Sequence, residues 1–343
     1  MRGPTLDELG WSPSRQTEFL QYAERGLAPA RVAVQHRGEY VLYTGDGELR
    51  ARPSGRLSHA ALDASELPTV GDWVAVRENK IETVLSRQTK FARKVTLARS
   101  VEQVLAANID VVFVVLATVP PPDLQDLERY LTAAWDSGAT PLVVVTKIDL
   151  GAVDQRIESV ALGVPVHALS ALTGEGVEQL DAHLQSGRTI ALLGPSGAGK
   201  STLINFLYGE ELLATRAVDA EGEGRHTTTR RELIRLPSGA LVVDTPGLRE
   251  LQLFGDTGMQ SAFEDIEELA VDCRFRDCRH DVEPGCAVQD AIADGRLAAE
   301  RLDSMRAFER ELVWVARRHD KRVHAELKRR WRKQMRARRR TIY

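Results

Sequence analysis

The pattern of apolar and polar positions changes character along the chain, and its first distinct part is β-like. Residues 31–90 hold short runs rich in Val, Tyr and Thr, separated by Gly, Pro and Asp: RVAVQHRGEYVLYT, GELRARPSG, VGDWVAVR and KIETVL. Several short strands at such spacing predict a small antiparallel barrel, and five strands would fit an oligonucleotide-binding barrel. Another kind of small β domain would give a similar pattern, so that alternative stays open.

From about residue 109 the pattern becomes that of an α/β domain. The segments IDVVFVVLAT, PLVVVTKID, VPVHALS, TIALLG and GALVVDTPG are rich in apolar residues, as parallel strands buried on both faces are. DLERYLTAAWDSG has the periodicity of an amphipathic helix. Strands that alternate with helices predict a doubly wound sheet with right-handed crossovers.

The remaining segments set the expected domain organisation. A short helix is predicted around Thr17 to Arg25, and after about residue 256 the chain becomes helical and charged. We therefore expect a multidomain protein with these parts: an N-terminal extension (1–28), an oligonucleotide-binding barrel (29–95), an α/β domain (96–255), a helical domain (256–320) and a basic tail (321–343).

Composition and charge narrow the class of protein. With 343 residues, 43% of them hydrophobic, the chain is long enough for two or three domains with ample core. No apolar run approaches the roughly 20 residues of a membrane helix, and the N-terminus lacks the apolar segment of a signal peptide. We expect a cytoplasmic protein without a membrane partner, and a monomer.

The net charge of −3 hides an asymmetry. Residues 317–343 hold 13 Lys and Arg against Asp320 and Glu326, a net charge of +11. The other residues hold 33 basic against 47 acidic side chains, a net charge of −14. A basic tail on an acidic body predicts contact with a polyanion, although such a run can also be a solvated end.

A phosphate-binding loop follows the apolar strand TIALL. GPSGAGKS fits G-x-x-x-x-G-K-[ST] and precedes the helix-like STLINFLYG, which is the context that such a loop requires. Its glycines allow backbone N–H groups to point at phosphates, and we expect Lys200 to reach the β- and γ-phosphates and Ser201 to bind Mg²⁺. The expected phosphate-binding residues are Gly194, Pro195, Ser196, Gly197, Ala198, Gly199, Lys200, Ser201 and Thr202.

Two segments after this loop predict the remaining parts of a magnesium–phosphate site. Asp244 ends the strand LVV, begins the motif Asp-Thr-Pro-Gly and is expected to hold Mg²⁺, while the N–H of Gly247 can sense a γ-phosphate. Thr228 or Thr229, in EGRHTTTR, can supply a hydroxyl to Mg²⁺ when the γ-phosphate is present, and the sequence does not decide between them. The alternative is a solvated polar turn.

A guanine reader is predicted at residues 146–149. The Asp149 carboxylate can accept hydrogen bonds from N1–H and the N2 amino group of guanine, and adenine lacks these donors. The stem of Lys147 can pack along the base. The predicted pocket comprises Thr146, Lys147, Ile148 and Asp149, closed by Ser170 and Ala171. Thr146 stands where most GTPases have Asn, so its hydroxyl would have to replace the amide.

The base reader precedes the phosphate loop, which reverses the usual GTPase order. Rotating the order of base reader, phosphate loop, threonines and DTPG restores it, so we infer a circular permutation. Leu248 follows DTPG where many GTPases carry a water-positioning Gln, and leucine cannot orient water. Intrinsic hydrolysis is therefore expected to be slow, unless His226 or a partner completes the site.

All three cysteines fall within a short stretch near residue 280. Cys273, Cys278, His280 and Cys286 have the spacing C-x4-C-x-H-x5-C, which matches a closed tetrahedral zinc site. Four protein ligands leave no open position, so the zinc would be structural and tie together a domain with little core. Arginines between the ligands would suit an RNA backbone.

These features together resemble the ribosome small subunit-dependent GTPase family of circularly permuted bacterial GTPases. The resemblance rests on T-K-I-D, GPSGAGKS and DTPG in permuted order, the VGDWV segment and the zinc spacing, and it covers about residues 30–320. It implies binding and hydrolysis of GTP to GDP, stimulated by the small ribosomal subunit during its late maturation, with 16S rRNA as partner. Nothing is carried over to the first 28 residues or the Arg-rich end.

Three alternatives remain at this point. A non-catalytic rRNA-binding scaffold with a vestigial nucleotide site would show no GTP turnover, and the intact Lys200, Ser201, Asp244 and Asp149 argue against it. A permuted GTPase of the large subunit would lack the zinc segment and the barrel. A small-molecule P-loop kinase would not need a guanine reader.

Overall fold

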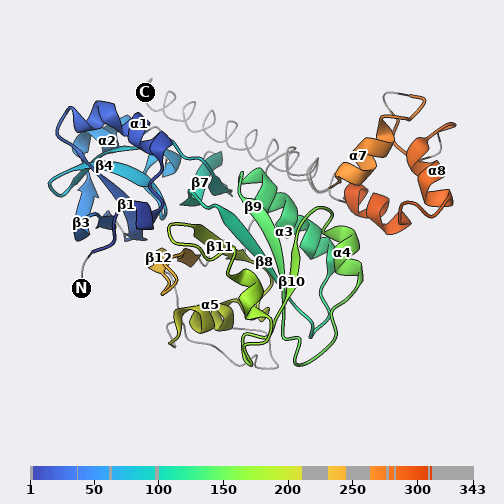
Figure 1. The fold of residues 1–343 in the computed structure, drawn as a ribbon. Helices are drawn as coiled ribbons and strands as arrows, with labels where there is room; N and C mark the ends of the chain where they lie inside the picture. The colour runs from blue at the N-terminus through green and yellow to red at the C-terminus, as the bar shows by residue number, and fades with distance from the viewer. Residues whose placement is uncertain are drawn as a thin grey trace, which may run out of the picture. The chain divides into compact units, whose positions relative to one another are not determined.

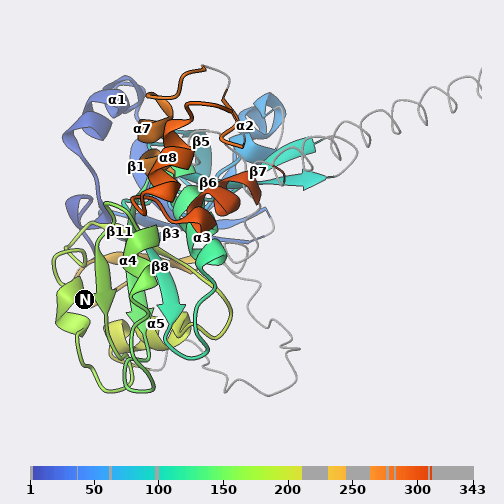
Figure 2. The ribbon, with the colours of Figure 1, turned by 90° about the vertical axis from the view of Figure 1, so that its right-hand side faces the viewer.

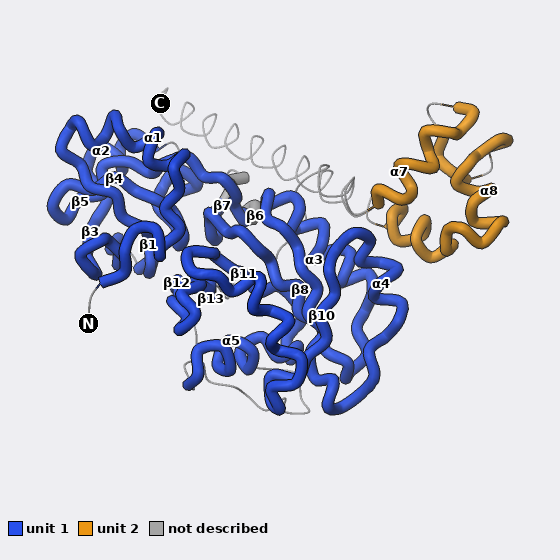
Figure 3. Tube along the Cα trace, viewed as in Figure 1, with its two compact units in different colours: residues 1–93, 102–262 blue, residues 94–101, 263–343 orange. Residues whose placement is uncertain are grey.

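A computed structural model describes residues 3–36, 38–61, 64–96, 100–210, 231–244, 263–275, 278–281, 283–307 and 310. The chain divides into two compact units (Figure 3): residues 1–93 and 102–262 form unit 1, and residues 94–101 and 263–343 form unit 2. In the ranges just given, no helix is long and apolar enough to cross a membrane. The finer domain bounds expected from the sequence stay predictions.

Five strands of unit 1 close into the expected barrel (Figure 1). They are β1 (Ala28–Gln35), β2 (Tyr40–Thr44), β3 (Gly47–Pro53), β4 (Trp73–Arg77) and β5 (Lys80–Val84). The strands pair in the order β1–β2–β3–β5–β4, and β4 pairs with β1 to close the ring. Alternate residues fill the interior, as the period of a strand requires; they include Ala30, Val32, Leu42, Ala51, Val74 and Ile81.

Short helices flank the barrel: η1 (Asp7–Leu9), α1 (Pro13–Ala23), α2 (Gly55–Ala60) and η2 (Ala64–Glu66). The helix expected near Thr17 begins earlier, because Ser12 caps it by accepting the Arg15 N–H and Pro13 occupies its first turn. Phe19 of α1 is buried, and the Trp11 ring lies edge-on to it. The N-terminal segment is thus packed into unit 1.

The α/β part is a mainly parallel sheet, as expected. Its parallel strands lie in the order β10 (Val166–Ala168), β9 (Thr140–Thr146), β8 (Val111–Ala117), β11 (Thr189–Leu193) and β13 (Leu241–Asp244). The connecting helices are α3 (Leu124–Asp136), α4 (Arg156–Val160), η3 (Val177–Leu180) and α5 (Lys200–Tyr208). β11, which precedes the expected phosphate loop, lies beside β8 although it comes much later in the chain, in agreement with the inferred permutation.

Each face of this sheet has its own hydrophobic core, which makes the sheet doubly wound. Val112 and Val114 of β8 belong to the core that contains Leu127 and Leu131 of α3. Phe113 of β8 faces the other core, with Leu203 and Ile204 of α5 among its members. Figure 1 shows α3 and α4 on one side of the strands and α5 on the other, and Figure 2 shows α3 and α4 from the side.

Three strands were not expected from the sequence: β6 (Lys90–Thr96), β7 (Ser100–Ala107) and β12 (Arg231–Arg235). β6 and β7 form a separate two-stranded sheet. β12 pairs antiparallel with β13 and also with β1 of the barrel. The barrel and the α/β sheet are therefore one continuous sheet of hydrogen-bonded strands.

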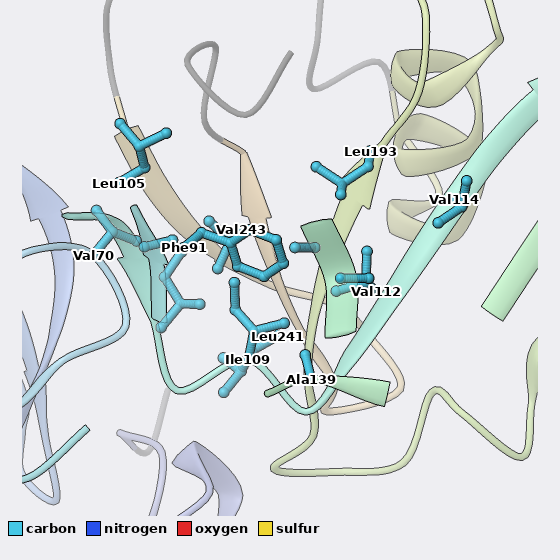
Figure 4. Close-up of a cluster of buried hydrophobic side chains, with 14 of the residues drawn as sticks. Val70, Phe91, Leu105, Ile109, Val112, Val114, Ala139, Leu193, Leu241 and Val243 are labelled. Atoms are coloured by element: carbon cyan, nitrogen blue, oxygen red, sulfur yellow. The ribbon is translucent and has the colours of Figure 1, made fainter. Parts of the chain in front are cut away.

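A shared core also joins the barrel to the α/β sheet. In Figure 4, Phe91 and Ile109 lie close to Leu241 and Val243 of β13. Fully buried Val70, before β4, is in the same cluster. Removal of this apolar surface from water stabilises the junction in proportion to its area.

Buried Arg31 of β1 adds hydrogen bonds at the same junction. Its guanidinium donates to the Asn108 carbonyl at 3.0 Å, to the Thr189 hydroxyl at 2.7 Å and to the Leu9 carbonyl. Burial lowers its pKa to about 10, with Asp110 opposing that effect, so the side chain stays protonated at neutral pH. Thr189 begins β11, the strand that leads to the phosphate loop.

The described part of unit 2 after residue 262 contains helices, in agreement with the sequence. α7 (Glu264–Ala270) and α8 (Ala287–Ala293) pack together, and residues 299–307 are also helical. Arg301 pairs with Asp265 at 2.8 Å and lies over the ring of buried Phe263. The basic tail, 321–343, lies outside the described residues.

Candidate nucleotide site and metal centre

The expected nucleotide-binding segments meet at one edge of the sheet. Thr118 follows β8, Thr146 ends β9, Ser170 follows β10, Gly194 follows β11 and Asp244 ends β13. These strands are parallel, so all five residues lie at their carboxyl ends. Ligands of open α/β sheets bind at this edge.

The phosphate loop has the backbone that its glycines predict. Gly194 has φ 137°, and a Cβ atom there would lie 2.0 Å from the Val115 carbonyl oxygen. Gly199 has φ 86° and immediately precedes α5. Any side chain at Gly194 would displace β8, so the loop's path depends on the absence of one.

Lys200 is the first residue of α5, and its amine curls back over the loop. Nζ donates to the carbonyl oxygens of Gly194 at 2.7 Å and Pro195 at 2.6 Å. The side chain is buried, yet its amine lies within the loop where phosphates are expected. Ser201 follows on the helix and is half-buried, as is Asp244.

Thr146 connects the predicted base reader to the phosphate loop. Its buried hydroxyl lies 3.0 Å from the Leu116 carbonyl oxygen and 2.7 Å from that of Ala198. Ala198 belongs to the phosphate loop, so threonine provides a connection between the two sites. Thr146 makes this connection with a hydroxyl donor, at a position where most GTPases have the side-chain amide of Asn.

The backbone of the predicted base reader has an unusual conformation. Lys147 has φ 61°, in the left-handed region that non-glycine residues rarely adopt. The Thr118 hydroxyl donates to the Lys147 carbonyl at 2.6 Å and thereby supports this turn. Asp149 is exposed and accessible to a ligand. Sequence reasoning missed Thr118, because a lone threonine after a strand carries no distinct signal.

In the segment after β10, the Ser170 N–H is not available to a ligand. The Ser170 N–H donates to the Glu175 carbonyl at 2.9 Å, and Ser170 is buried. The Ile148 N–H, 3.5 Å from the Leu169 carbonyl, brings this segment beside the base reader. The Ser170 N–H is thus bonded within the chain, and the expected contact of Ala171 with guanine stays a prediction.

Several expected site residues cannot be placed. Thr228, Thr229, His226 and Gly247, together with Leu248, lie outside the described residues. Their assignments stay predictions.

The four expected metal ligands of unit 2 come together. Cys273 Sγ lies 3.6 Å from His280 Nδ1 and 3.9 Å from Cys286 Sγ, and Cys286 Sγ lies 3.4 Å from the same nitrogen. With Cys278, the ligand atoms all lie within 4.8 Å of one another. A tetrahedral zinc ion with ordinary bond lengths separates its ligand atoms by about 3.5 to 3.8 Å. The donor set and its spacing therefore fit a metal ion.

Two residues that the sequence did not indicate support this cluster. His280 has φ 56°, and its carbonyl accepts hydrogen bonds from Gln289 Nε2 at 2.5 Å and Arg306 Nη2 at 2.6 Å. Cys286 caps α8, where the Gln289 N–H points at its sulfur at 3.5 Å. Such outer contacts orient metal ligands.

The protonation of the thiols bears on metal binding. Burial, together with the neighbouring Cys286 and Cys273 thiols, raises the pKa of Cys278 to about 11. A metal ion must therefore displace a proton from this thiol, because thiolate is the ligand.

Comparison with protein families gives a match to the α/β part of the chain. The model of the RsgA GTPase family matches residues 84–254. Two relatives named small ribosomal subunit biogenesis GTPase RsgA are each 43% identical to this chain. The protein from Opitutus terrae covers 96% of this chain and 95% of its own length, and that from Streptomyces coelicolor covers 96% and 92%.

Solved structures give the same relationship at the level of the fold. The crystal structure of YjeQ from Thermotoga maritima aligns with a TM-score of 0.64 at 25% identity, over 84% of this chain and 99% of that chain. The crystal structure of YloQ, described as a circularly permuted GTPase, aligns with a TM-score of 0.59 at 24% identity, over 83% and 94%.

Proposed function

The chain belongs to the RsgA GTPase family, and from this membership we propose that it hydrolyses GTP and acts on the small ribosomal subunit during its late maturation. The relatives at 43% identity carry the name of a small ribosomal subunit biogenesis GTPase over nearly the same length. The observation within this chain that supports the proposal is the contact between the Thr146 hydroxyl and the Ala198 carbonyl, because it joins the segment proposed to read guanine to the loop proposed to bind phosphates.

Different residues of the site are proposed to bind the guanine base and the phosphates. Asp149 accepts from guanine, the Lys147 stem packs along the base, and the Ala171 N–H meets the O6 atom. The phosphate loop surrounds the β- and γ-phosphates with N–H groups and with Lys200, which exchanges its contacts with Gly194 and Pro195 for phosphate oxygens. The positive end of α5 adds to this field.

The chemistry requires a divalent cation at the same place. Ser201 and Asp244 would hold Mg²⁺, joined by Thr228 or Thr229 when the γ-phosphate is present, and Mg²⁺ supplies charge neutralisation at the transferring phosphate. Gly247 is proposed to sense the γ-phosphate. Leu248 cannot orient water, so turnover by the chain alone would be slow unless His226 orients the water instead. Otherwise the ribosomal subunit would complete the site.

Unit 2 is proposed to carry one structural zinc ion bound by Cys273, Cys278, His280 and Cys286. The ligand spacing supports zinc, and four protein ligands leave no position for substrate. The exposed Arg274 and Arg279 near the ligands, together with the tail at 321–343, would contact 16S rRNA. We further propose that the chain acts as a cytoplasmic monomer.

The decisive experiment is multiple-turnover phosphate release from GTP and from ATP, with and without purified small ribosomal subunits. We expect slow release from GTP alone, strong stimulation by small subunits and no release from ATP. Purified large subunits serve as the control and should not stimulate. Absence of turnover in every condition would contradict the proposal and favour a non-catalytic scaffold.

A further inference from the structure

The strand β12 connects the barrel to the strand that ends in Asp244. On one side β12 pairs with β13 at four positions, and one of these pairs sets Glu232 of β12 opposite Asp244, the last residue of β13. On its other side it pairs with β1, where Val34 lies opposite the same Glu232. A barrel residue is therefore only two strand pairings away from the residue proposed to hold Mg²⁺.

Beyond these backbone pairings, the Tyr43 side chain of the barrel contacts β12. The Tyr43 hydroxyl donates to the Leu233 carbonyl at 3.3 Å, although Tyr43 belongs to β2. Burial, with Glu48 and Glu232 nearby, raises the pKa of Tyr43 to about 12. The hydroxyl is therefore a permanent donor at neutral pH.

A second side-chain contact lies at the first residue of β12. Arg231 Nη1 lies 3.4 Å from Gln35 Oε1 of β1 and 3.4 Å from the Val104 carbonyl oxygen. The Thr69 hydroxyl lies 3.4 Å from the same Gln35 oxygen and from the Val104 carbonyl. Arg231 of β12 thus reaches both Gln35 of the barrel and Val104 of β7.

The far end of β12 is also tied to the N-terminal segment. Arg235 Nη2 lies 3.0 Å from Glu8 Oε2, and both side chains are partly exposed. A pair of this exposure contributes little to stability. The side-chain contacts of Tyr43 and Gln35 thus add to the backbone pairings that hold β12.

The path of β1 allows these contacts. Its register with β2 shifts between Val32 and Val34, as at a β-bulge. β1 pairs with β4 through Arg31 and with β12 from Val34 onward. A bulge bends a strand and alters its twist, so one strand can serve both the barrel and the α/β sheet.

We propose that Tyr43 and Gln35 are positioning residues for the magnesium–nucleotide site, which they serve by holding β12 and, through it, Asp244. The inference rests on the proposed function, since it takes Asp244 as the residue that holds Mg²⁺. It adds that the barrel is a part of the nucleotide site's support and not only a separate binding module. Weakening this support should loosen Mg²⁺-dependent binding of nucleotide and leave the guanine and phosphate-loop contacts intact.

The test is the affinity for a fluorescent, non-hydrolysable GTP analogue across a Mg²⁺ titration, with GDP affinity in EDTA as the second measurement. Tyr43→Phe removes only the hydroxyl, and Gln35→Ala removes one acceptor of Arg231. We expect the Mg²⁺ concentration for half-maximal binding to rise by about threefold to tenfold, the range of one ordinary hydrogen bond. GDP affinity in EDTA should stay unchanged.

Matched variants separate positioning from general stability. Tyr130→Phe removes the hydroxyl of another partly buried tyrosine, on α3, and Arg52→Ala breaks the barrel's Arg52–Glu39 pair. Neither change touches β12, and neither should alter the Mg²⁺ titration. Gln35→Glu keeps an acceptor oxygen for Arg231 and should restore the response lost in Gln35→Ala.

The outcomes distinguish this inference from the proposed function, because binding is measured without hydrolysis. A Mg²⁺ titration of Tyr43→Phe and Gln35→Ala equal to that of the original chain would overturn the inference. An equal loss of GDP affinity in EDTA would overturn it too, since it would mean general damage to the site. Failure of the original chain to hydrolyse GTP would contradict the proposed function and leave this binding comparison decisive.

Discussion

The Thr146 hydroxyl lies 2.7 Å from the carbonyl oxygen of Ala198, so the end of β9 is tied to the phosphate loop. Both groups are buried, and the same hydroxyl lies 3.0 Å from the Leu116 carbonyl. A Cβ atom at Gly199 would lie 3.2 Å from the Thr146 oxygen, so this loop and this side chain are in close contact. A change at residue 146 should consequently affect base and phosphate binding together.

Thr146→Val tests this connection with little change of volume. We expect GTP and GDP affinity to fall in parallel by about fivefold, because a buried carbonyl loses a donor at a cost of about 1 kcal/mol. Isothermal titration with both nucleotides measures the effect. Thr146→Ser keeps the hydroxyl and should retain most of the affinity. A fall for one nucleotide alone would mean that the connection does not join the two halves of the site.

Asp149→Asn tests the guanine reader. The amide can donate a hydrogen bond where the carboxylate only accepts, so it should pair poorly with the N2 amino group of guanine and well with the 2-oxo group of xanthine. We expect GDP affinity to fall by at least about a hundredfold. In competition binding, the affinity for xanthosine diphosphate should rise. Asp154→Asn, at an exposed Asp154–Arg156 pair, is the control. Unchanged preference for GDP would remove Asp149 from the base pocket.

The elements that the sequence predicted well are those with a local signal. The strands of the parallel sheet are nearly continuous apolar runs, and Gly194 and Gly199 occupy backbone conformations that few other residues adopt. The four expected metal ligands have short spacings within one segment, so their convergence needs little knowledge of the rest of the fold.

The contacts that sequence analysis missed join residues far apart in the chain. Arg31 and Thr189 are separated by 158 positions, and Tyr43 and Leu233 by 190. β12 has the short sequence RELIR, whose pattern does not reveal that it pairs with the barrel on one side and β13 on the other. Such pairings depend on tertiary packing, which hydrophobic periodicity does not encode.

Removal of the metal should affect unit 2 and spare the nucleotide site. We expect one zinc per chain by elemental analysis, and a chelator should unfold the helical segment around residues 263–307, because binding of a structural metal supplies folding free energy. GDP affinity should stay within about twofold when Mg²⁺ is kept in excess, since none of the four proposed zinc ligands belongs to unit 1. Circular dichroism and GDP titration on the same sample measure both effects, and a parallel loss of GDP binding would contradict this separation.

The supporting contacts of the metal cluster allow a finer test. Gln289→Ala removes one of two donors to the His280 carbonyl and should raise the zinc dissociation constant by about tenfold or more. Competition with a chromogenic chelator measures it. Gln179→Ala, which removes a contact to His167 in unit 1, is the control and should leave zinc affinity unchanged. An unchanged zinc affinity in Gln289→Ala would show that the His280 carbonyl needs no support.

The raised pKa of Tyr43 predicts a loss of stability at alkaline pH. Its pKa is about 12 in the folded chain, chiefly because burial disfavours the phenolate, against an ordinary value near 10. The contribution is fully present below pH 10 and is lost as pH rises toward 12, because the unfolded chain releases the proton first. Tyr43→Phe should therefore lose less stability than the original chain over this interval, in urea titrations at matched pH. Tyr22→Phe, at a residue near the N-terminus, is the comparison, and an equal pH dependence in Tyr43→Phe and the original chain would mean that the hydroxyl is not buried against β12.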